Sequence, residues 1–421
     1  MVFACRMRLA CFAAILIAAA PARAEISLRG AIDFGCALAT DASTAEPPEG
    51  FTQTDSETMS FPGGRERERV LLEGDAEAIE IVLDRAGSGP SRATVTLSRD
   101  ERPDSLAMAL AAENTCDVIE ARRIERGGDG MAVAIALLDA SLQETGERIE
   151  LNPPVPEGTD PGGITVAHVD SGVNYLLPQI SAALARDADG AILGHDFWDQ
   201  DERPFDVDTG RSPFFPLHHG TSVASVLLAE APAVRLVPLR YPRPDMTRMA
   251  DVVKRAVTSG ARIVMMPMGS NDPGLWQAFA DAARNAPDTL FIVSAGNDGR
   301  DIDVDPLYPA VLDLPNMLVV TSADDFGRLA QGSNWGSESV DVMVPAERLT
   351  TTDHRGAQVQ ASGSSYAVPR VAASAARLLA QNPDWKAAEL IARIGELCAP
   401  PMDRGEPRVK LGWIPDPANL P

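Results

Sequence analysis

The chain has 421 residues, 45% of them hydrophobic, and its 37 Lys and Arg against 60 Asp and Glu give a formal net charge of −23 at pH 7. This length exceeds one typical domain and predicts two. The acidic balance disfavours nucleic acid as a partner, because phosphate backbones bind basic surfaces. No stretch after residue 24 reaches the ~18 uninterrupted apolar residues of a membrane span, so we expect no membrane anchor.

Residues 1–24 have the three parts of a secretory signal peptide. Arg6 and Arg8 make a basic start, Leu9–Ala20 is an apolar run, and Ala22-Arg23-Ala24 is a small-residue cleavage site. We therefore expect removal of this segment and export of the protein to the periplasm or the extracellular space.

Residues 25–150 predict a smaller, mostly β domain. Short apolar or alternating runs such as Ala78–Leu83 and Ala93–Leu97 are separated by turn-forming Pro and Gly residues. One helix is expected near Ser105–Cys116. Residues 151–163 are too rich in Pro and Gly to continue a helix or a central strand, and they predict a linker.

Residues 164–405 predict a domain of the α/β class, because short buried-looking strands alternate with longer amphipathic helices. Such alternation is typical of a parallel sheet covered by helices on both faces. The expected strands are Ile164–Val169, Val234–Leu239, Ile263–Met266, Leu290–Ser294 and Met317–Thr321, and the expected helices are Val223–Ala229, Asp245–Ser259, Leu275–Ala286 and Val371–Gln381. We interpret residues 406–421 as a C-terminal tail.

Three cysteines follow residue 24, namely Cys36, Cys116 and Cys398. In an oxidising compartment an odd number implies one disulfide and one leftover thiol. We expect the disulfide to join Cys36 to Cys116, because both lie in the amino-terminal region.

Asp170 and His219 are candidates for an acid–base pair. Asp170 ends an apolar run and precedes Ser171-Gly172, so a carboxylate stands where a strand must turn; taken alone, this pattern is typical of an ordinary turn. His219 precedes Gly220, which permits close backbone approach, and a helix pattern begins at once. A histidine held there has a near-neutral pKa and can accept a proton.

Ser365 and Asn297 are candidates for a nucleophile and an oxyanion donor. Ser365 lies directly before an Ala-rich helix, whose N-terminus supplies N–H groups and a favourable dipole for a developing anion, although a serine N-cap would look the same. Asn297 follows Ala295-Gly296 at a strand end, where its carboxamide could reach that anion. An Asn-containing turn is the alternative.

Together, in the order Asp, His, Asn, Ser, these patterns closely resemble the subtilisin-like serine proteases (subtilases) over about residues 164–400. Family members show Asp-Ser-Gly or Asp-Thr-Gly, His-Gly-Thr, Ala-Gly-Asn and Gly-Thr-Ser-Met-Ala-x-Pro. The matching segments are Asp170-Ser171-Gly172, His219-Gly220-Thr221, Ala295-Gly296-Asn297 and Gly363-Ser364-Ser365-Tyr366-Ala367-Val368-Pro369.

The resemblance implies a subtilisin-like sheet and a serine endopeptidase acting on protein or peptide substrates. In that mechanism Ser365 attacks the peptide carbonyl, His219 takes and returns the proton, and Asp170 holds the imidazole tautomer. Asn297 and the Ser365 backbone N–H hold the oxyanion, and an acyl-enzyme forms without a cofactor. The alternative is a catalytically silent binding or chaperone-like protein with the same fold. Oligomeric state, natural substrate and cleavage specificity stay open.

The chain departs from the family pattern near the substrate. Pro267-Met268-Gly269 stands where Ser-Leu-Gly usually lines the specificity pocket, and with Ala295 and Gly296 it forms the implied substrate-binding edge. The proline removes one donor, which puts specificity in doubt. Ser222 replaces a histidine that often follows His-Gly-Thr, and Ser364 replaces the usual threonine.

The order and spacing of the histidines exclude two other enzyme classes. An α/β-hydrolase needs its histidine after the serine, whereas the last histidine, His354, precedes Ser365. Adjacent His218 and His219 have the wrong spacing for zinc on one helix face. The acidic run Asp199–Asp208 does not match an EF-hand, so we expect a solvated loop; structural calcium is possible but not indicated, and no metal site is predicted.

Residues 25–150 occupy the place where secreted subtilases usually carry a removable propeptide. The position favours that role, but a β-rich pattern fits poorly to the two-helix propeptide common in the family. A propeptide could add Glu150–Pro153 as a strand to the active-site edge. A retained accessory domain is the other interpretation, and both stay open here.

Overall fold

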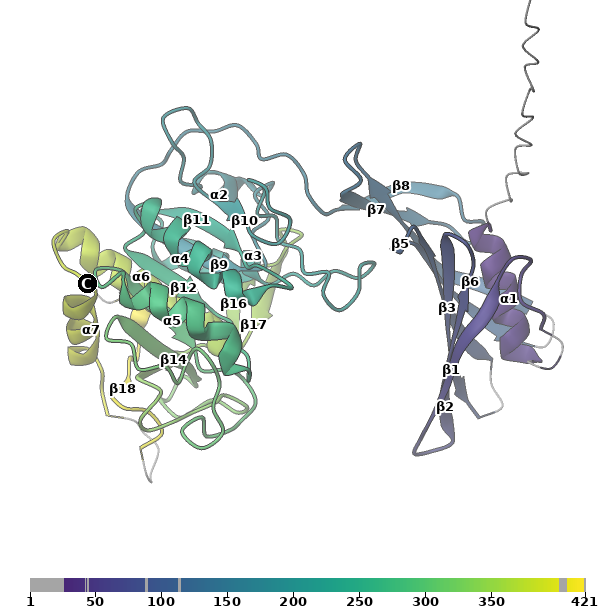
Figure 1. The fold of residues 1–421 in the computed structure, drawn as a ribbon. Coiled ribbons are helices and arrows are strands. Elements are labelled where there is room, and N and C mark those ends of the chain that lie inside the picture. Colours follow the sequence, from purple (N-terminus) through teal and green to yellow (C-terminus); the bar gives the residue numbers. More distant parts are fainter. Residues whose placement is uncertain are drawn as a thin grey trace, which may run out of the picture. The chain divides into compact units, whose positions relative to one another are not determined.

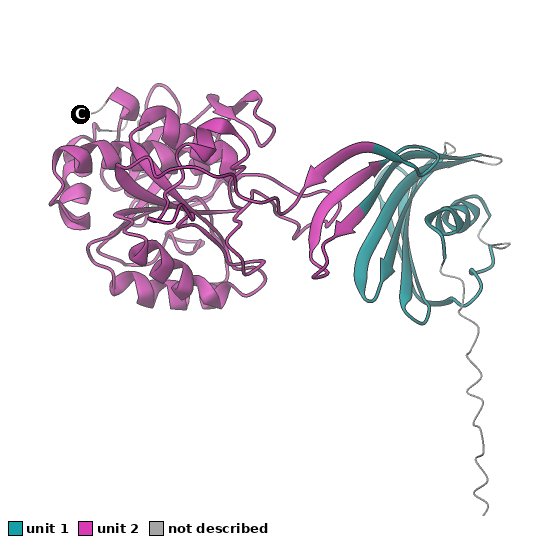
Figure 2. Cartoon of the chain, turned by 90° about the horizontal axis from the view of Figure 1, so that it is seen from above, with its two compact units in different colours: residues 1–123, 138–145 teal, residues 124–137, 146–421 magenta. Residues whose placement is uncertain are grey.

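The computed structural model describes residues 26–419 except for 42, 44, 88–89, 113–114 and 401–406, so the expected signal peptide lies outside the described residues. The chain divides into two compact units, drawn in different colours in Figure 2. One contains the chain through Arg123 together with Leu138–Thr145, and the other contains Ile124–Leu137 and Gly146–Pro421.

The amino-terminal region forms an eight-stranded sheet in chain order, which confirms the expectation of a mostly β domain (Figure 1). The pairs from β1 through β6 are antiparallel. The strands are β1 (Thr52–Phe61), β2 (Arg65–Glu73), β3 (Glu77–Ala86), β4 (Ser91–Arg99), β5 (Arg102–Ala112), β6 (Thr115–Arg126), β7 (Ala132–Leu138) and β8 (Glu144–Glu150).

One helix, α1 (Leu28–Thr40), packs on this sheet against β3, β4 and β5. It begins where the Ser27 side chain accepts a hydrogen bond from Gly30 N, 3.1 Å away. Gly35 permits the close approach, because a Cβ there would lie 2.9 Å from Val95 Cγ2. The expected helix at Ser105–Cys116 is wrong: the segment spans β5 and the start of β6. Its Ala-rich composition favours a helix locally, but pairing with two strands overrides that preference.

A disulfide joins Cys36 of α1 to Cys116 of β6, as predicted, and Cys398 is a free thiol. We expect Cys36→Ser to lower the free energy of unfolding of the amino-terminal unit by about 2–4 kcal/mol, because the bond closes a loop with a sequence separation of 80. Urea unfolding measures the loss, and peptide mapping without reduction checks the pairing. Cys398→Ser is the control. A bond from Cys398 to either partner would contradict the assignment.

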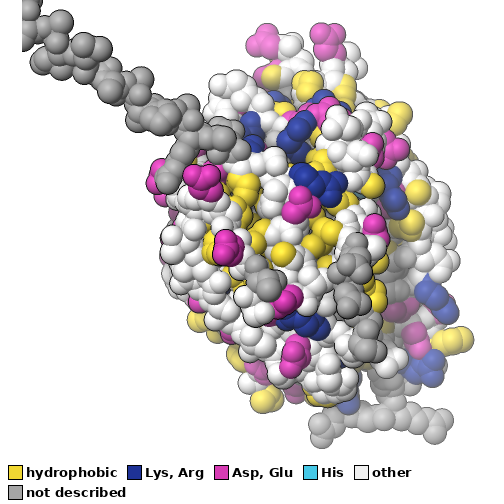
Figure 3. Space-filling view, turned by 90° about the vertical axis from the view of Figure 1, so that its right-hand side faces the viewer, with side chains coloured by type: hydrophobic (Ala, Val, Ile, Leu, Met, Phe, Trp, Pro, Cys, Tyr) yellow, Lys and Arg dark blue, Asp and Glu magenta, His cyan; other side chains and the backbone are white. Residues whose placement is uncertain are grey.

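The surface of the amino-terminal unit carries charges of both signs. Figure 3 shows Asp, Glu, Lys and Arg side chains interspersed with apolar ones over one face, with no large single-sign patch among the coloured residues. Charged side chains of this sheet pair across neighbouring strands, such as Arg67 with Asp84 and Arg85 with Glu68, both at 2.7 Å. Because these side chains remain in partial contact with water, such pairs contribute little stability.

The region from residue 164 onward forms a second eight-stranded sheet in the order β10-β11-β9-β12-β13-β14-β15-β18 (Figure 1). Every neighbouring pair in it is parallel. Its strands are β9 (Ile164–Asp170), β10 (His195–Asp196), β11 (Val234–Arg240), β12 (Ile263–Met266), β13 (Leu290–Ser294), β14 (Met317–Ala323), β15 (Val342–Pro345) and β18 (Gly412–Trp413). All five strands expected from the sequence are present, and β18 brings part of the expected tail into the sheet.

Helices cover both faces of this sheet, as predicted. They are α2 (Pro178–Ser181), α3 (Gly220–Glu230), α4 (Met249–Thr258), α5 (Gln277–Arg284), α6 (Ser364–Gln381) and α7 (Ala387–Glu396), with short 3₁₀ turns at Met246–Arg248, Pro273–Trp276 and Pro417–Asn419. Alternate residues of each strand enter different cores. Ile292 packs with α3, α6 and α7, whereas its neighbour Phe291 packs with α4 and α5.

Two further segments pack on this unit. A hairpin of β16 (Leu349–Thr352) and β17 (Gln358–Ala361) packs beside α3. The expected linker is hydrogen-bonded to the rest of its unit. The Tyr175 hydroxyl donates to Pro153 O at 2.6 Å, and Asp160 Oδ2 accepts from Arg186 N at 2.7 Å. Over the described part of the chain, none of the helices has both the length and the apolar character that crossing a bilayer requires.

Candidate active site

Asp170 is the last residue of β9 and is buried at the carboxyl end of the sheet. Its Oδ2 lies 2.8 Å from His219 Nδ1 and 3.2 Å from His168 Nε2, and its Oδ1 accepts from Ser171 N at 2.7 Å. Burial alone would raise the pKa of Asp170, but the charge of His219 and the hydrogen bonds from both histidines bring it well below its usual range. The carboxylate is therefore ionised beside the imidazole.

His219 is the N-cap residue of α3, and its side chain is 37% exposed. Because Asp170 can only accept, Nδ1 carries the proton and Nε2 is left as a base. Burial lowers the pKa of His219, but the charge and hydrogen bond of Asp170 outweigh it and raise the pKa to about 9. Among the described residues, Asp170 is the only hydrogen-bond partner of the His219 side chain. Ser365 is therefore not bonded to His219 in this structure. Such catalytic hydrogen bonds often tighten only when substrate binds.

Asp206, which the sequence analysis placed in a solvated acidic loop, is fully buried, so that interpretation is wrong for this residue. Its Oδ1 accepts from His219 N at 3.0 Å and from Ser171 Oγ at 2.6 Å, and its Oδ2 accepts from Thr221 N at 2.9 Å. Burial would raise the pKa of Asp206, yet His354 and these donors lower it to about 2. Asp206 thus caps α3 and positions the backbone of His219. No local sequence signal marks this role, because the contact spans 13 residues of irregular chain.

Gly220 is required for the approach of α3 to β9. A Cβ at this position would lie 2.0 Å from Gly172 O and 3.1 Å from Asp170 Cβ. Any larger side chain would push His219 away from its carboxylate, so the close backbone approach expected from the sequence is confirmed.

Ser365 is the second residue of α6 and is half-buried. Gly363 precedes the helix with φ 126°, a conformation that L side chains rarely adopt. Ser364 N then donates to Asn297 Oδ1 at 2.9 Å, and Ser364 Oγ accepts from Gly296 N at 3.2 Å. Because the Asn297 carbonyl oxygen faces an N–H, its NH₂ group is left at the exposed side. The structure thus brings Asn297 to the helix start that carries Ser365.

Asn334, which the sequence analysis missed, builds the turn that carries Asn297. It is fully buried, and its Oδ1 accepts from Asp298 N at 2.8 Å while its Nδ2 donates to Ala295 O at 2.8 Å. Its backbone N donates to Gly296 O at 3.0 Å. The carbonyl groups of Ala295 and Gly296 are therefore already bonded within the protein.

The expected substrate edge follows β12. Pro267 is buried, Met268 is half-buried and Gly269 is exposed. Next to them Ser270 and Tyr308 form an antiparallel bridge, with Ser270 N 2.8 Å from Tyr308 O. A Cβ on Gly269 would lie 2.7 Å from Tyr308 O, so this position needs glycine.

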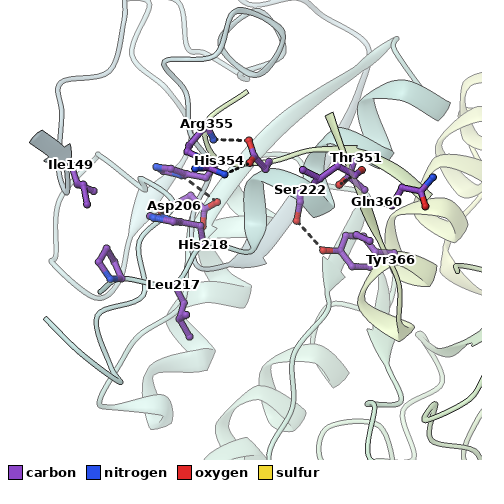
Figure 4. Close-up of a pocket in the computed structure, with 14 residues that line it drawn as sticks. Ile149, Asp206, Leu217, His218, Ser222, Thr351, His354, Arg355, Gln360 and Tyr366 are labelled. Atoms are coloured by element: carbon purple, nitrogen blue, oxygen red, sulfur yellow. Dashed lines mark hydrogen bonds and ion pairs between the residues drawn. The ribbon is translucent and has the colours of Figure 1, made fainter. Parts of the chain in front are cut away.

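Asp206, His218 and His354 bring three potential metal ligands within 4.8 Å of one another. They line a cavity of about 600 Å³ next to α3, where the two imidazoles stack with ring centroids 3.6 Å apart and 12° between planes (Figure 4). A bound metal lies in the plane of each imidazole that holds it, so two nearly parallel rings cannot both ligate one ion in this arrangement. The donor set does not fit a metal centre.

The parallel sheet places Asp170 at the end of β9, His219 at the start of α3 and Ser365 in the first turn of α6. The sequence profile of the Subtilase family matches residues 162–396. The chain belongs to the subtilase family of serine peptidases, and the resemblance and fold class expected from the sequence are confirmed.

Several characterised proteins are similar to this chain. The "Thermophilic serine proteinase" of Bacillus sp. (strain AK1) is 28% identical over 241 residues, 52% of this chain and 53% of that protein. "Thermitase" of Thermoactinomyces vulgaris is 27% identical over 236 residues, 52% of this chain and 76% of that protein. The chain thus matches about half the length of the first of these relatives.

Two solved structures share the fold. A cold adapted subtilisin-like serine proteinase aligns with a TM-score of 0.50 and 21% identity, covering 64% of this chain and 93% of that one. A lanthipeptide protease aligns with a TM-score of 0.51 and 21% identity, covering 62% and 89%.

Proposed function

We propose that this protein is an exported serine endopeptidase that cleaves protein or peptide substrates through an acyl-enzyme. The observation that carries the proposal is the Asp170–His219 pair, whose 2.8 Å contact leaves a neutral Nε2 as the only basic nitrogen of the ring. Together with a serine in the first turn of α6, this pair supplies a nucleophile and a base. The proposed chemistry needs no cofactor.

In the proposed reaction Ser365 Oγ attacks the peptide carbonyl while His219 Nε2 accepts its proton. The positive imidazole that forms is stabilised by the buried carboxylate of Asp170. Asn297 Nδ2 and the Ser365 backbone N–H donate to the oxyanion, and the α6 dipole favours its charge. His219 then protonates the leaving amine, and water releases the acyl group by the reverse sequence.

Hydrolysis of casein by the purified protein, blocked by a serine-directed sulfonyl fluoride, tests this function. Label at Ser365 together with loss of cleavage supports it. Binding of peptides without turnover would favour the alternative of a catalytically silent protein with the same fold.

The activity should have an alkaline pH profile. His219 acts as a base only when neutral, and its pKa is raised from 6.5 to about 9, so most of the enzyme is protonated and inactive at pH 7. We expect kcat/KM to rise through pH 7–9 and to level off above about pH 9. Initial rates on a chromogenic peptide across this range measure it. A plateau already reached at pH 6 would contradict the raised pKa.

We propose that residues 25–150 are retained as an accessory domain. Leu151 N donates to Val133 O of β7 at 2.9 Å, and Arg186 Nη2 donates to Pro156 O at 2.8 Å, so these backbone groups already have partners other than the substrate edge. We expect active wild-type protein and Ser365→Ala to keep the same amino terminus near Glu25. Amino-terminal sequencing checks this. A wild-type terminus at residues 150–163, with an intact Ser365→Ala chain, would instead identify a propeptide.

A further inference from the structure

Two positions at which this chain departs from the subtilase pattern meet in space. Ser222 stands where a histidine often follows His-Gly-Thr, and Tyr366 stands where methionine follows the nucleophile. Their hydroxyl oxygens are 3.1 Å apart, although the residues are 144 positions apart in the chain. Figure 4 shows this contact as a dashed line at the edge of the cavity.

The direction of the hydrogen bonds in this pair follows from counting protons. Ser222 Oγ donates its single proton to His219 O, 2.8 Å away. Tyr366 must therefore be the donor to Ser222 Oγ. The result is a directed chain of two hydrogen bonds, from the residue next to Ser365 to the backbone of His219.

This chain connects the two helix starts that carry the proposed nucleophile and base. Tyr366 lies in the first turn of α6, one residue after Ser365, and Ser222 lies in the first turn of α3. The Tyr366 and His219 rings are near each other, with centroids 6.2 Å apart. Both hydroxyl-bearing residues are half-buried, so water competes only partly for the bond.

We propose that the Tyr366–Ser222 hydrogen bond is a positioning device that sets the distance between Ser365 Oγ and His219 Nε2. The inference rests on the proposed peptidase function. Proton transfer from a serine to a base requires near-contact geometry, and a displacement of about 1 Å can cost on the order of a hundredfold in rate. A hydrogen bond between the two first turns restrains this distance without touching the substrate.

The device is suited to the alkaline range in which His219 becomes neutral. Burial raises the pKa of Tyr366 above its ordinary value of 10.0. The phenol therefore keeps its proton and continues to donate at pH 9, where the proposed base is losing its own.

Tyr366→Phe, Ser222→Ala and the double variant test the proposal. Two quantities are measured at pH 9: kcat and KM on a chromogenic peptide, and the rate constant of Ser365 labelling by a fluorophosphonate. We expect each single variant to lose about ten- to a hundredfold in kcat and in labelling rate, with KM within about twofold of wild type. The double variant should lose no more than Ser222→Ala alone, because that change already removes both hydrogen bonds of the chain.

Two controls separate positioning from general loss of stability. Ser222→Thr keeps the hydroxyl and should retain labelling within about threefold of wild type. Tyr175→Phe removes a comparable hydrogen bond from a fully buried tyrosine to Pro153 O, 2.6 Å long, and should leave the labelling rate unchanged. Thermal unfolding of every variant confirms that the protein measured is folded.

The outcomes are distinct. A wild-type labelling rate in Tyr366→Phe, or single losses that multiply in the double variant, would overturn the positioning role while leaving the peptidase intact. Wild-type protein that neither cleaves peptides nor takes label at Ser365 would overturn the proposed function and this inference together.

Discussion

Ser365→Ala should abolish peptide hydrolysis, with kcat falling by about 10⁶-fold, while the fold is kept. The change removes one half-buried hydroxyl, and the helix start beneath it is held by other groups: Ser364 N donates to Asn297 Oδ1 at 2.9 Å. Initial rates on a chromogenic peptide measure the loss, and circular dichroism with thermal unfolding checks the fold. More than a trace of the wild-type rate would refute the nucleophile assignment.

Asn297→Ala should reduce the activity without abolishing it. The remaining donor, the Ser365 backbone N–H, can still hold the oxyanion, so kcat should fall by about 10²–10³-fold rather than vanish. A loss confined to KM would show that Asn297 binds substrate and does not stabilise the transition state. Because Asn297 also accepts from Ser364 N, Asn297→Asp keeps that bond while a carboxylate oxygen replaces the NH₂ donor, so its kcat should fall at least as far as that of Asn297→Ala.

Asp170→Asn should lower kcat by about 10⁴-fold, because the new amide inverts the tautomer of His219. Its orientation is determined by Ser171 N, which donates to Oδ1 at 2.7 Å and therefore places the carbonyl oxygen there. The NH₂ group then takes the position of Oδ2, 2.8 Å from His219 Nδ1, and donates to it. Nδ1 also lies 2.9 Å from Oδ1, but a ring that accepts the NH₂ hydrogen bond carries its proton on Nε2 and cannot act as a base.

The same variant should change the pH dependence of what activity remains. The charge and hydrogen bond of Asp170 raise the pKa of His219 to about 9, and without them burial favours the neutral ring. Residual kcat/KM should therefore lose its alkaline rise. Asp160→Asn is the matched control, since this carboxylate pairs with Arg235 at 2.9 Å in the catalytic unit; its kcat should stay within about twofold of wild type. Activity of Asp170→Asn within tenfold of wild type would contradict the assignment.

The expected strands of the catalytic domain could be read from the chain because their signals are local. A parallel strand covered on both faces is a short continuous apolar run, and Ile164–Asp170 and Leu290–Ser294 are such runs. Asp170 and His219 could be named from the motif resemblance, because their signals are also local. Asp170 ends a strand before Ser171-Gly172, His219 precedes Gly220 at a helix start, and the parallel topology brings such points to one edge.

The supports of the site were decided only by the tertiary structure. Asp206 and Asn334 are ordinary loop residues in sequence, and both prove to be buried anchors whose partners lie on other segments. Ser222 and Tyr366 could be recorded as departures from a pattern, but only the packing of α3 against α6 shows that they share a hydrogen bond.

In the amino-terminal domain, too, local sequence signals predicted some features and only the tertiary structure decided others. Its β content follows from turn signals and alternation, which are properties of neighbouring residues. Which segment forms the helix does not follow from neighbouring residues. Ser105–Cys116 has the better helical composition, yet pairing with β4 and β6 holds it as a strand. Leu28–Thr40 forms α1 because its apolar face packs against the small alanine side chains of β5. Sequence determined what each segment could form alone, and long-range burial and pairing decided between competing local preferences.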